Sequence, residues 1–491
     1  MYTHHALRRI NWLVIALLTA GCGGDDSGNE PNPDGSVVIL SGNNQSATAG
    51  TALDPIELRV LRPDGEPIVG AEVSWRLING CGSISQPVNT TDDLGIAATI
   101  ATLSPVIGAQ SIEATVSGFD PVIFHATATA PTGTAFKVLA GCNNVPERYG
   151  SDLWIADGYA YSGTWGFRGV AGNAVKIWKL NDGGAPVLAD SIIISGIGTV
   201  SDLEVSPDGK WLIATAEGGG DKNGLYVYEL PMPGHPVLRA RQSVPSGLHT
   251  GTLSVIDGTL YAFTAKDPLN CALQIYDLSA AASGTVTLAK SVPIPDNYCI
   301  HDTFVRDGLA FVFAWDEGLY IFDVGKGTIG GSPSDPKLVS HSGRAGDPDT
   351  YGGQTHNGWW FWNPTNGEKR YLFIGEEGPG NVGASSSGSI HVVDVSNLAA
   401  PVQVATYTMA GAGVHNFWMD EQAQVLYAAF YNGGIVALDV SGTLTGNLAS
   451  REIARVRPGG ANNTYMWGVM LYDGYLYGSD MVSGFWQLAV P

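Results

Sequence analysis

The chain has 491 residues, and its composition excludes several classes of partner and fold. Lys and Arg number 25 against 46 Asp and Glu, so the formal net charge at pH 7 is −21. This excess of negative charge disfavours binding to nucleic acid or to anionic lipid headgroups. Charged residues make up only 14% of the chain, whereas glycine occurs 65 times and proline 27 times. Such a composition disfavours long surface helices and favours short strands joined by turns.

The first residues have the pattern of an export signal. Arg8 and Arg9 precede the apolar run 12–18, and small residues then lead to Cys22. The apolar run is too short to cross the ~30 Å hydrocarbon core of a bilayer as a permanent helix. The pattern resembles a bacterial lipoprotein signal with its lipobox. The resemblance implies removal of residues 1–21, acylation of Cys22 with palmitate-type chains, and stable anchoring in a membrane.

The residues after the lipobox predict where the protein is held. Gly23 stands where some bacterial lipoproteins carry an aspartate that retains them at the inner membrane, so we expect a lipid-anchored protein of the cell envelope, at the outer membrane or cell surface. Residues 22–36 contain acids, glycines and prolines and no large apolar side chain. This segment is therefore predicted to be a flexible tether.

Four further cysteines remain, at positions 81, 142, 271 and 299, and none forms a C-x-x-C pair. Their spacing disfavours a zinc site, and an oxidising envelope favours disulfides. Four cysteines allow three pairings. We favour Cys271–Cys299, which lie in one repeat and at the entry to the next, and Cys81–Cys142 as a clasp between domains.

Residues 37–130 have the spacing of strands and turns that is typical of an antiparallel β-sandwich. Strands with alternating apolar residues, such as 56–60 and 71–75, are separated by turns such as Pro63-Asp64-Gly65. The segments NQSATAGTAL, LRPDGEPIVGAEVSWRL and NTTDDLGIAATIATL resemble the invasin/intimin-type bacterial Ig-like domain. The resemblance implies a stalk or adhesin module without catalytic residues.

Residues 134–491 repeat a unit of roughly 45–65 residues, a period typical of a β-propeller. Strands ending in an acid recur at 225–230, 273–278, 319–324, 390–395 and 435–440. Buried hairpins are predicted at 152–161, 202–215, 252–264, 301–314, 356–375, 415–430 and 467–479, which makes seven blades. The last unit lacks a fourth strand, and we expect segment 135–140 to supply it and so remove an open sheet edge. The motif Asp394-Val395-Ser396 followed by Pro401-Val402 resembles LVIVD-repeat propeller proteins of bacterial surfaces. The predicted fold class is therefore all-β, an Ig-like sandwich followed by a seven-bladed propeller.

Two sets of residues are expected to converge at one mouth of the propeller channel. Three histidines, His301, His356 and His415, begin equivalent inner strands, and His249 lies close to its equivalent position. Acids follow the second strands at Glu217, Asp316, Glu376 and Asp480. Imidazoles and carboxylates within a few ångström of one another can bind a transition metal, with His301, His356 and His415 as its ligands. Structural hydrogen bonding and a pocket for a small ligand or anion are the alternatives.

The aromatic run 359–362 follows His356 directly. Consecutive residues of a strand point to opposite faces, so part of this run fills the core. Trp359 is the candidate for an aromatic platform that would stack a sugar or an apolar ligand.

These observations favour a binding or interaction protein over an enzyme. A lipid anchor would attach the chain to a membrane, and the Ig-like module would raise the propeller towards a surface protein, a glycan or a small molecule. No catalytic residue is assigned, and no cofactor is identified beyond the possible transition metal. The alternative is a propeller enzyme, possibly metal-dependent, that uses the histidines at the channel mouth.

Overall fold

The computed structural model describes residues 35–133, 135–166, 169–181, 184–294, 299–325, 328–347 and 350–491. The predicted signal peptide, Cys22 and nearly all of the tether lie outside these ranges. The described residues are almost entirely strand, with three short 3-10 turns, η1 (Gly220–Lys222), η2 (Ala281–Ser283) and η3 (Ala449–Arg451). The prediction of an all-β chain is confirmed. In the described ranges, no helix has the length and apolar character needed to cross a membrane.

The N-terminal unit consists of two main sheets that enclose one core. In β3, alternate residues Ile56, Leu58 and Val60 are fully buried, as period-two alternation requires of a strand with one face on a core. Trp75 and Phe124 pack between the sheets with ring centroids 5.8 Å apart. The sheets are β1 (Ser36–Ser41), β3 (Ile56–Leu61) and β7 (Ile96–Thr99); β2 (Gln45–Thr48), β10 (Val122–Thr129), β9 (Gly108–Val116), β4 (Glu72–Leu77) and β6 (Val88–Thr90); and the small pair β5 (Ser83–Ile84) and β8 (Ala101–Thr102).

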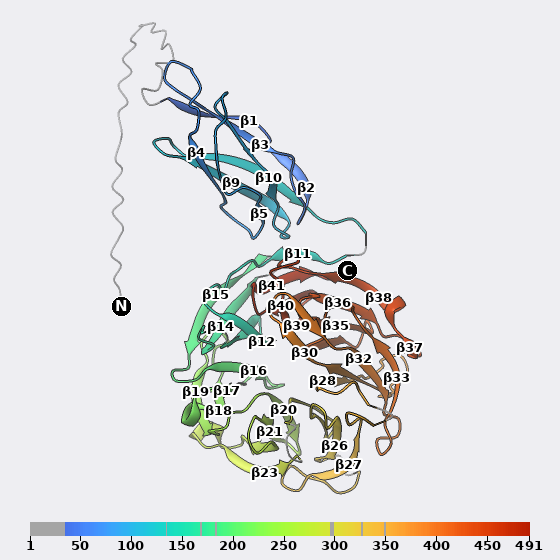
Figure 1. The fold of residues 1–491 in the computed structure, drawn as a ribbon. Coiled ribbons are helices and arrows are strands. Elements are labelled where there is room, and N and C mark those ends of the chain that lie inside the picture. Colours follow the sequence, from blue (N-terminus) through green and yellow to red (C-terminus); the bar gives the residue numbers. More distant parts are fainter. Residues whose placement is uncertain are drawn as a thin grey trace, which may run out of the picture.

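The remaining strands form sheets arranged in a ring, as in a β-propeller (Figure 1), and their strands pair antiparallel except where residues 405–406 and 446–447 pair parallel. The first three are β12 (Tyr149–Ala156), β13 (Tyr159–Trp165), β14 (Ala174–Asn181) and β15 (Gly184–Ile193); β16 (Thr199–Val205), β17 (Trp211–Glu217), β18 (Gly224–Glu229) and β19 (Val237–Ser243); and β20 (Gly251–Ile256), β21 (Thr259–Lys266), β22 (Ala272–Asp277) and β23 (Thr287–Pro293). The next are β24 (Asp302–Arg306), β25 (Leu309–Phe313), β26 (Leu319–Asp323) and β27 (Lys337–Ser342); β28 (Thr355–Trp360), β29 (Tyr371–Glu376), β32 (Ile390–Asp394), β33 (Val402–Tyr407) and β37 (Gly446–Asn447); and β34 (Phe417–Asp420), β35 (Val425–Ala429), β36 (Ile435–Asp439) and β38 (Glu452–Val456). The short hairpin β30 (Gly378–Asn381) and β31 (Ser385–Ser387) is inserted after β29.

One sheet joins the two ends of the ring. The strand β11 (Lys137–Ala140) pairs antiparallel with β41 (Gly484–Ala489). In the same sheet, β41 pairs with β40 (Tyr475–Asp480), and β40 pairs with β39 (Met466–Tyr472). This pairing gives the C-terminal hairpin a fourth strand and satisfies the backbone groups of an edge that would otherwise be open.

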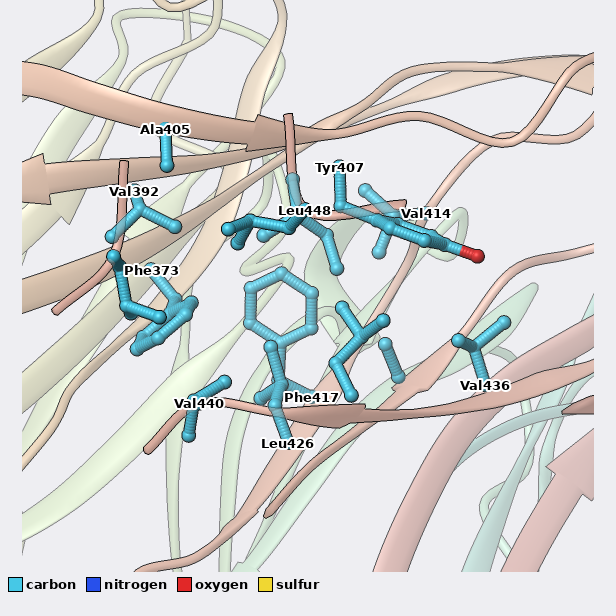
Figure 2. Close-up of a cluster of buried hydrophobic side chains, with 14 of the residues drawn as sticks. Phe373, Val392, Ala405, Tyr407, Val414, Phe417, Leu426, Val436, Val440 and Leu448 are labelled. Carbon is cyan, nitrogen blue, oxygen red and sulfur yellow. The ribbon is translucent and has the colours of Figure 1, made fainter. Parts of the chain in front are cut away.

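Neighbouring sheets pack face to face through apolar side chains, as Figure 2 shows for one pair. Phe373 and Val392 of one sheet face Leu426 and Val436 of the next, and all four are fully buried. Truncating a buried phenylalanine to alanine typically costs about 3–5 kcal/mol. These contacts therefore fix the spacing of the sheets and, with it, the position of the inner strands.

Two disulfides are present, and both confirm the favoured pairing. Cys81 of the N-terminal unit is bonded to Cys142, which follows β11, with Cα atoms 5.3 Å apart. Cys271 is bonded to Cys299, with Cα atoms 5.0 Å apart. A backbone hydrogen bond from Ile107 to Val138 adds to the junction between the unit and the ring. The N-terminal unit is thus covalently clasped to the strand that closes the ring.

Candidate functional site

One of the predicted histidines lies at a bulge near the start of its inner strand. In β28, Thr355 pairs with Glu376 and Asn357 with Gly375, so His356 is the extra residue. Trp467 occupies the same kind of position in β39. Two residues of a bulged strand oppose one residue of the partner strand, which re-aims the side chains at that point.

Four histidines form a continuous row where the inner strands begin. The ring centroids are 4.2 Å apart for His249 and His301, 3.9 Å for His301 and His356, and 4.1 Å for His356 and His415. Trp467 continues the row 4.2 Å beyond His415, and Trp165 links it back to His249. The structure therefore brings together all four histidines that the sequence singled out.

A carboxylate lies against three of these imidazoles. Oε2 of Glu377 is 3.4 Å from Nε2 of His301 and 3.8 Å from Nε2 of His356, and Oε1 is 3.9 Å from Nε2 of His415. Tyr431 donates its hydroxyl hydrogen to Oε1 of Glu377. This hydrogen bond fixes the position of the Glu377 carboxylate beside the histidines.

Several nitrogens of these imidazoles have no hydrogen-bond partner in the described part of the chain: Nδ1 of His301, both ring nitrogens of His356, and Nε2 of His415. The three side chains are buried, with exposures of 5%, 1% and 2%. A buried polar atom without a partner costs about 1–3 kcal/mol. This cluster is therefore costly as it stands and has free lone pairs for a ligand.

Electrostatics keep these imidazoles neutral. Burial and the neighbouring imidazoles hold the pKa of His301 and of His356 well below the ordinary value. Burial lowers the pKa of His415 to about 3, although a hydrogen bond with the backbone carbonyl of Trp467 opposes this. Neutral imidazole is the form that binds a metal.

His249 differs from the other three. Burial disfavours its charged form, but the carboxylates of Glu217, Asp267 and Glu377 together outweigh burial and raise the pKa of His249 to about 9. Oε1 of Glu217 lies 3.0 Å from Nδ1 of His249. This pair lies at one end of the row and is a charged hydrogen-bonded pair, unlike the neutral histidines beside it.

The spacing of the donor atoms fits a transition metal. One ligand atom each from His301, His356 and Glu377 lies within 4.8 Å of the other two. Two ligands about 2.05 Å from a tetrahedral metal are about 3.3–3.4 Å apart, and the His301–Glu377 separation is 3.4 Å. Two or three imidazoles with one carboxylate suit zinc, copper or iron. His415, the third histidine predicted as a ligand, is not part of this three-residue group, although its Nε2 has no partner among the described residues.

The other predicted acids have contacts elsewhere. Glu376 points to His391, with Oε2 3.2 Å from Nε2, and accepts a hydrogen bond from the backbone of Ser389. Asp316 accepts from the backbone nitrogen of Gln354. Asp480 accepts from the backbone nitrogens of three residues and fixes a turn: Tyr465, Val482 and Ser483. Glu217 is the predicted acid that contacts a histidine of the row.

The sequence interpretation missed Glu377. Glu376 ends β29, and strand alternation sends the next residue in another direction, so the second acid of the Glu376-Glu377 pair reaches the histidines. The doubled acid was the only available signal. Tyr431, which positions Glu377, had no signal in the sequence because it comes from a different repeat.

Trp359 lies towards the other end of the inner strands. Its indole nitrogen donates to Oε1 of Glu421 at 3.2 Å, and its ring centroid is 5.3 Å from that of Trp418. It lines a separate cavity and does not contact the histidine row.

Comparison with known proteins finds similarity among solved structures alone. No family model matches the chain, and no curated protein matches it. Among solved structures, the chain is similar to the β-propeller domain of Cps50 (Swd1) from Myceliophteria thermophila, at 11% identity and a TM-score of 0.47. The similarity covers 70% of this chain and 98% of that domain.

Proposed function

We propose that the chain is a lipid-anchored, extracytoplasmic binding protein of the cell envelope, in which an Ig-like stalk carries a seven-bladed propeller. The lipobox ending at Cys22 supports the anchor, and a β-propeller is compatible with a binding role. The two-sheet unit at residues 36–129 supports the stalk, and the disulfide Cys81–Cys142 supports its fixed attachment to the propeller. The sheets between β11 and β41, one for each predicted hairpin, support seven blades.

The propeller holds a transition metal at the histidine row. His301, His356 and Glu377 are its ligands. The observation that carries this proposal is the fully enclosed imidazole of His356, whose ring nitrogens have no hydrogen-bond partner among the described residues, beside a carboxylate oxygen that lies 3.4 Å from Nε2 of His301 and 3.8 Å from Nε2 of His356. A neutral imidazole has one lone-pair nitrogen, and a bound cation would occupy it in His356 and also compensate the buried charge of Glu377, whose pKa burial raises to about 7.

Burial favours a stabilising metal over a catalytic one. A catalytic zinc keeps one coordination position open to water or substrate. Here Glu377 is only 5% exposed, and the rings of Tyr431, Trp467 and Trp315 pack against the histidines. A metal at this site would tie together inner strands from several sheets, and no route for a substrate is needed.

Metal analysis of the purified full chain tests the proposal. The chain is stripped with a chelator, then exposed to zinc or copper and desalted. We expect about one ion per chain for the parent and a large loss for His356→Gln, which keeps hydrogen-bonding capacity but weakens metal binding.

His391→Gln is the matched control. His391 is also a buried histidine of the same sheet, but both of its ring nitrogens already have partners, Gln403 and Glu376. Its variant should retain the metal. No stoichiometric metal in the parent, or equal loss in both variants, would overturn the metal site while leaving the anchored binding protein to be tested separately.

A further inference from the structure

A second cavity lies farther along the same inner strands, and it differs in chemistry from the histidine row. Its volume is about 330 Å³, at the lower end of the range for small-molecule sites. Residues two apart on an inner strand face the same way, so a polar and a large side chain of one strand can both reach the cavity. Asp152 and Trp154 of β12, Asp202 and Glu204 of β16, and Asp302 and Phe304 of β24 line the cavity in this manner.

Carboxylates form one layer of this cavity. Asp152 accepts a hydrogen bond from the Asn416 amide at 2.7 Å, and Asp202 accepts one from the backbone of Gly251 at 2.7 Å. In the part of the chain that the structure describes, Asp152, Asp202, Glu204 and Asp302 form no ion pair with lysine or arginine. Burial and the nearby Asp202 carboxyl raise the pKa of Asp152 and of Glu204 well above the ordinary value. A cation at this layer would stabilise their charged forms.

Aromatic rings form the adjoining wall. Trp154 and Trp418 have centroids 6.1 Å apart, Trp418 and Trp359 5.3 Å, and Trp359 and Phe304 5.2 Å. All four side chains are half-buried, so part of each ring faces the cavity. The negative face of an indole attracts a cation, more strongly where water is excluded.

The side chain of Arg306 already covers two of these aromatic rings. The guanidinium of Arg306 lies 5.2 Å from the centroid of Phe304 and 5.8 Å from that of Trp359. Its charge is matched by Glu421, 2.6 Å away, and not by the acids of the cavity. Among the described residues no lysine or arginine lies over Trp154 or Trp418, so these two indoles remain free for a ligand next to the carboxylates.

An unpartnered amide oxygen points to the kind of cation. Asn357 lines the cavity, is 4% exposed, and its Oδ1 has no hydrogen-bond partner among the described residues. This oxygen accepts hydrogen bonds and cannot donate them. A ligand that satisfies it must carry a donor, which a protonated amine has and a quaternary ammonium ion or a bare apolar group lacks.

We propose that this cavity binds a small organic ammonium ion, a protonated amine with an apolar or aromatic body. The ammonium group donates to the carboxylates of Asp152 and Asp202. The apolar body packs against Trp154 and Trp418. This site is distinct from the metal site, and the inference stands whether or not the histidine row binds a metal.

Calorimetry with a matched pair of probes tests the proposal. Benzylammonium and benzyl alcohol have nearly the same shape, but only the first is charged at pH 7. We expect benzylammonium to bind the full chain with one site and benzyl alcohol to bind at least about tenfold more weakly. Asp152→Asn and Trp418→Leu should each weaken benzylammonium binding by about tenfold or more. Asp335→Asn, which removes an exposed carboxylate, should leave it unchanged.

Three outcomes would overturn the proposal. The first is no binding of benzylammonium, and the second is equal binding of the two probes. The third is binding of calcium that Asp152→Asn weakens and Trp418→Leu does not, with no binding of benzylammonium, because that result describes an acidic inorganic-cation site. Thermal melts show whether each variant folds, and Trp418→Phe, which keeps a smaller aromatic face and should bind with intermediate affinity, replaces Trp418→Leu if that variant is unfolded.

Discussion

Oε2 of Glu377 lies 3.4 Å from Nε2 of His301, although the two residues belong to different sheets. His301 directly precedes β24, and Glu377 directly follows β29. The start of an inner strand and the end of a second strand lie at the same end of an antiparallel sheet. A contact between a residue at one such start and a residue at the next such end therefore links neighbouring sheets. Substitutions at this pair can therefore distinguish a metal site from ordinary packing between the sheets.

Adjacent glutamates provide the sharpest test of the metal site. We expect zinc at about one hundred times its dissociation constant to stabilise the parent by about 2.7 kcal/mol, a clear rise in melting temperature. Glu377→Gln should abolish this rise, because it removes the carboxylate that contacts three imidazoles. Thermal melts with and without zinc measure the effect.

Glu376→Gln is the control for that measurement. Its carboxylate contacts His391 and the backbone of Ser389, away from the unpartnered imidazoles. We expect this variant to keep the zinc-dependent rise. A rise that survives in Glu377→Gln would show that the zinc binds elsewhere.

Tyr431 is predicted to act through Glu377. Its hydroxyl donates to the carboxylate, and loss of an outer hydrogen bond to a ligating group typically lowers metal affinity about 10–100-fold. We therefore expect Tyr431→Phe to weaken zinc binding by this factor in a competition titration with a chelator. The neighbouring Tyr465, 4.3 Å away between centroids, has a hydroxyl without a partner among the described residues, so Tyr465→Phe should bind zinc as the parent does.

The sequence predicted the histidine row because repetition carries positional information. His301, His356 and His415 occupy one place in a repeated unit, and equivalent places in a closed ring of sheets lie close together. The place of Cys271 and Cys299 in the repeat also predicted their disulfide, and Cys81–Cys142 was the pair that remained.

Repetition could not predict the carboxylate that contacts the histidines. Glu376 has the right place in the repeat, but Glu377 makes the contact, because the direction of a side chain at a strand end depends on the local backbone and not on the repeat. The cavity beside Trp154 and Trp418 was missed for another reason. Its residues come from separate inner strands, and only the closed ring brings them together.

Membrane attachment is predicted to depend on Cys22. We expect Cys22→Ser to remain soluble after cell fractionation, because two or more acyl chains give stable anchoring and the variant has none. The disulfides and both folded units should be unaffected, which limited proteolysis and thermal melts can check. Retention of the variant in the membrane fraction would contradict the lipid anchor.

Asp480 predicts a specific dependence of stability on pH. Burial raises its pKa from the ordinary 3.8 to about 6, although hydrogen bonds from the backbone of Ser483, Tyr465 and Val482 oppose the shift. Between these two values the folded state binds more protons than the unfolded state. The contribution of Asp480 to the free energy of unfolding is therefore largest below pH 4 and is lost as the pH rises to about 6.

Asp480→Asn should remove this component, because an amide does not titrate. The variant is expected to be less stable than the parent at pH 4, where the protonated carboxyl is favoured, and the difference should shrink by on the order of 3 kcal/mol by pH 7. Urea unfolding of both proteins at a series of pH values measures the difference directly, and subtraction cancels the titration of all other groups. A difference that stays constant from pH 4 to pH 7, or that grows with pH, would show that the turn holds Asp480 in its charged form and that burial does not dominate there.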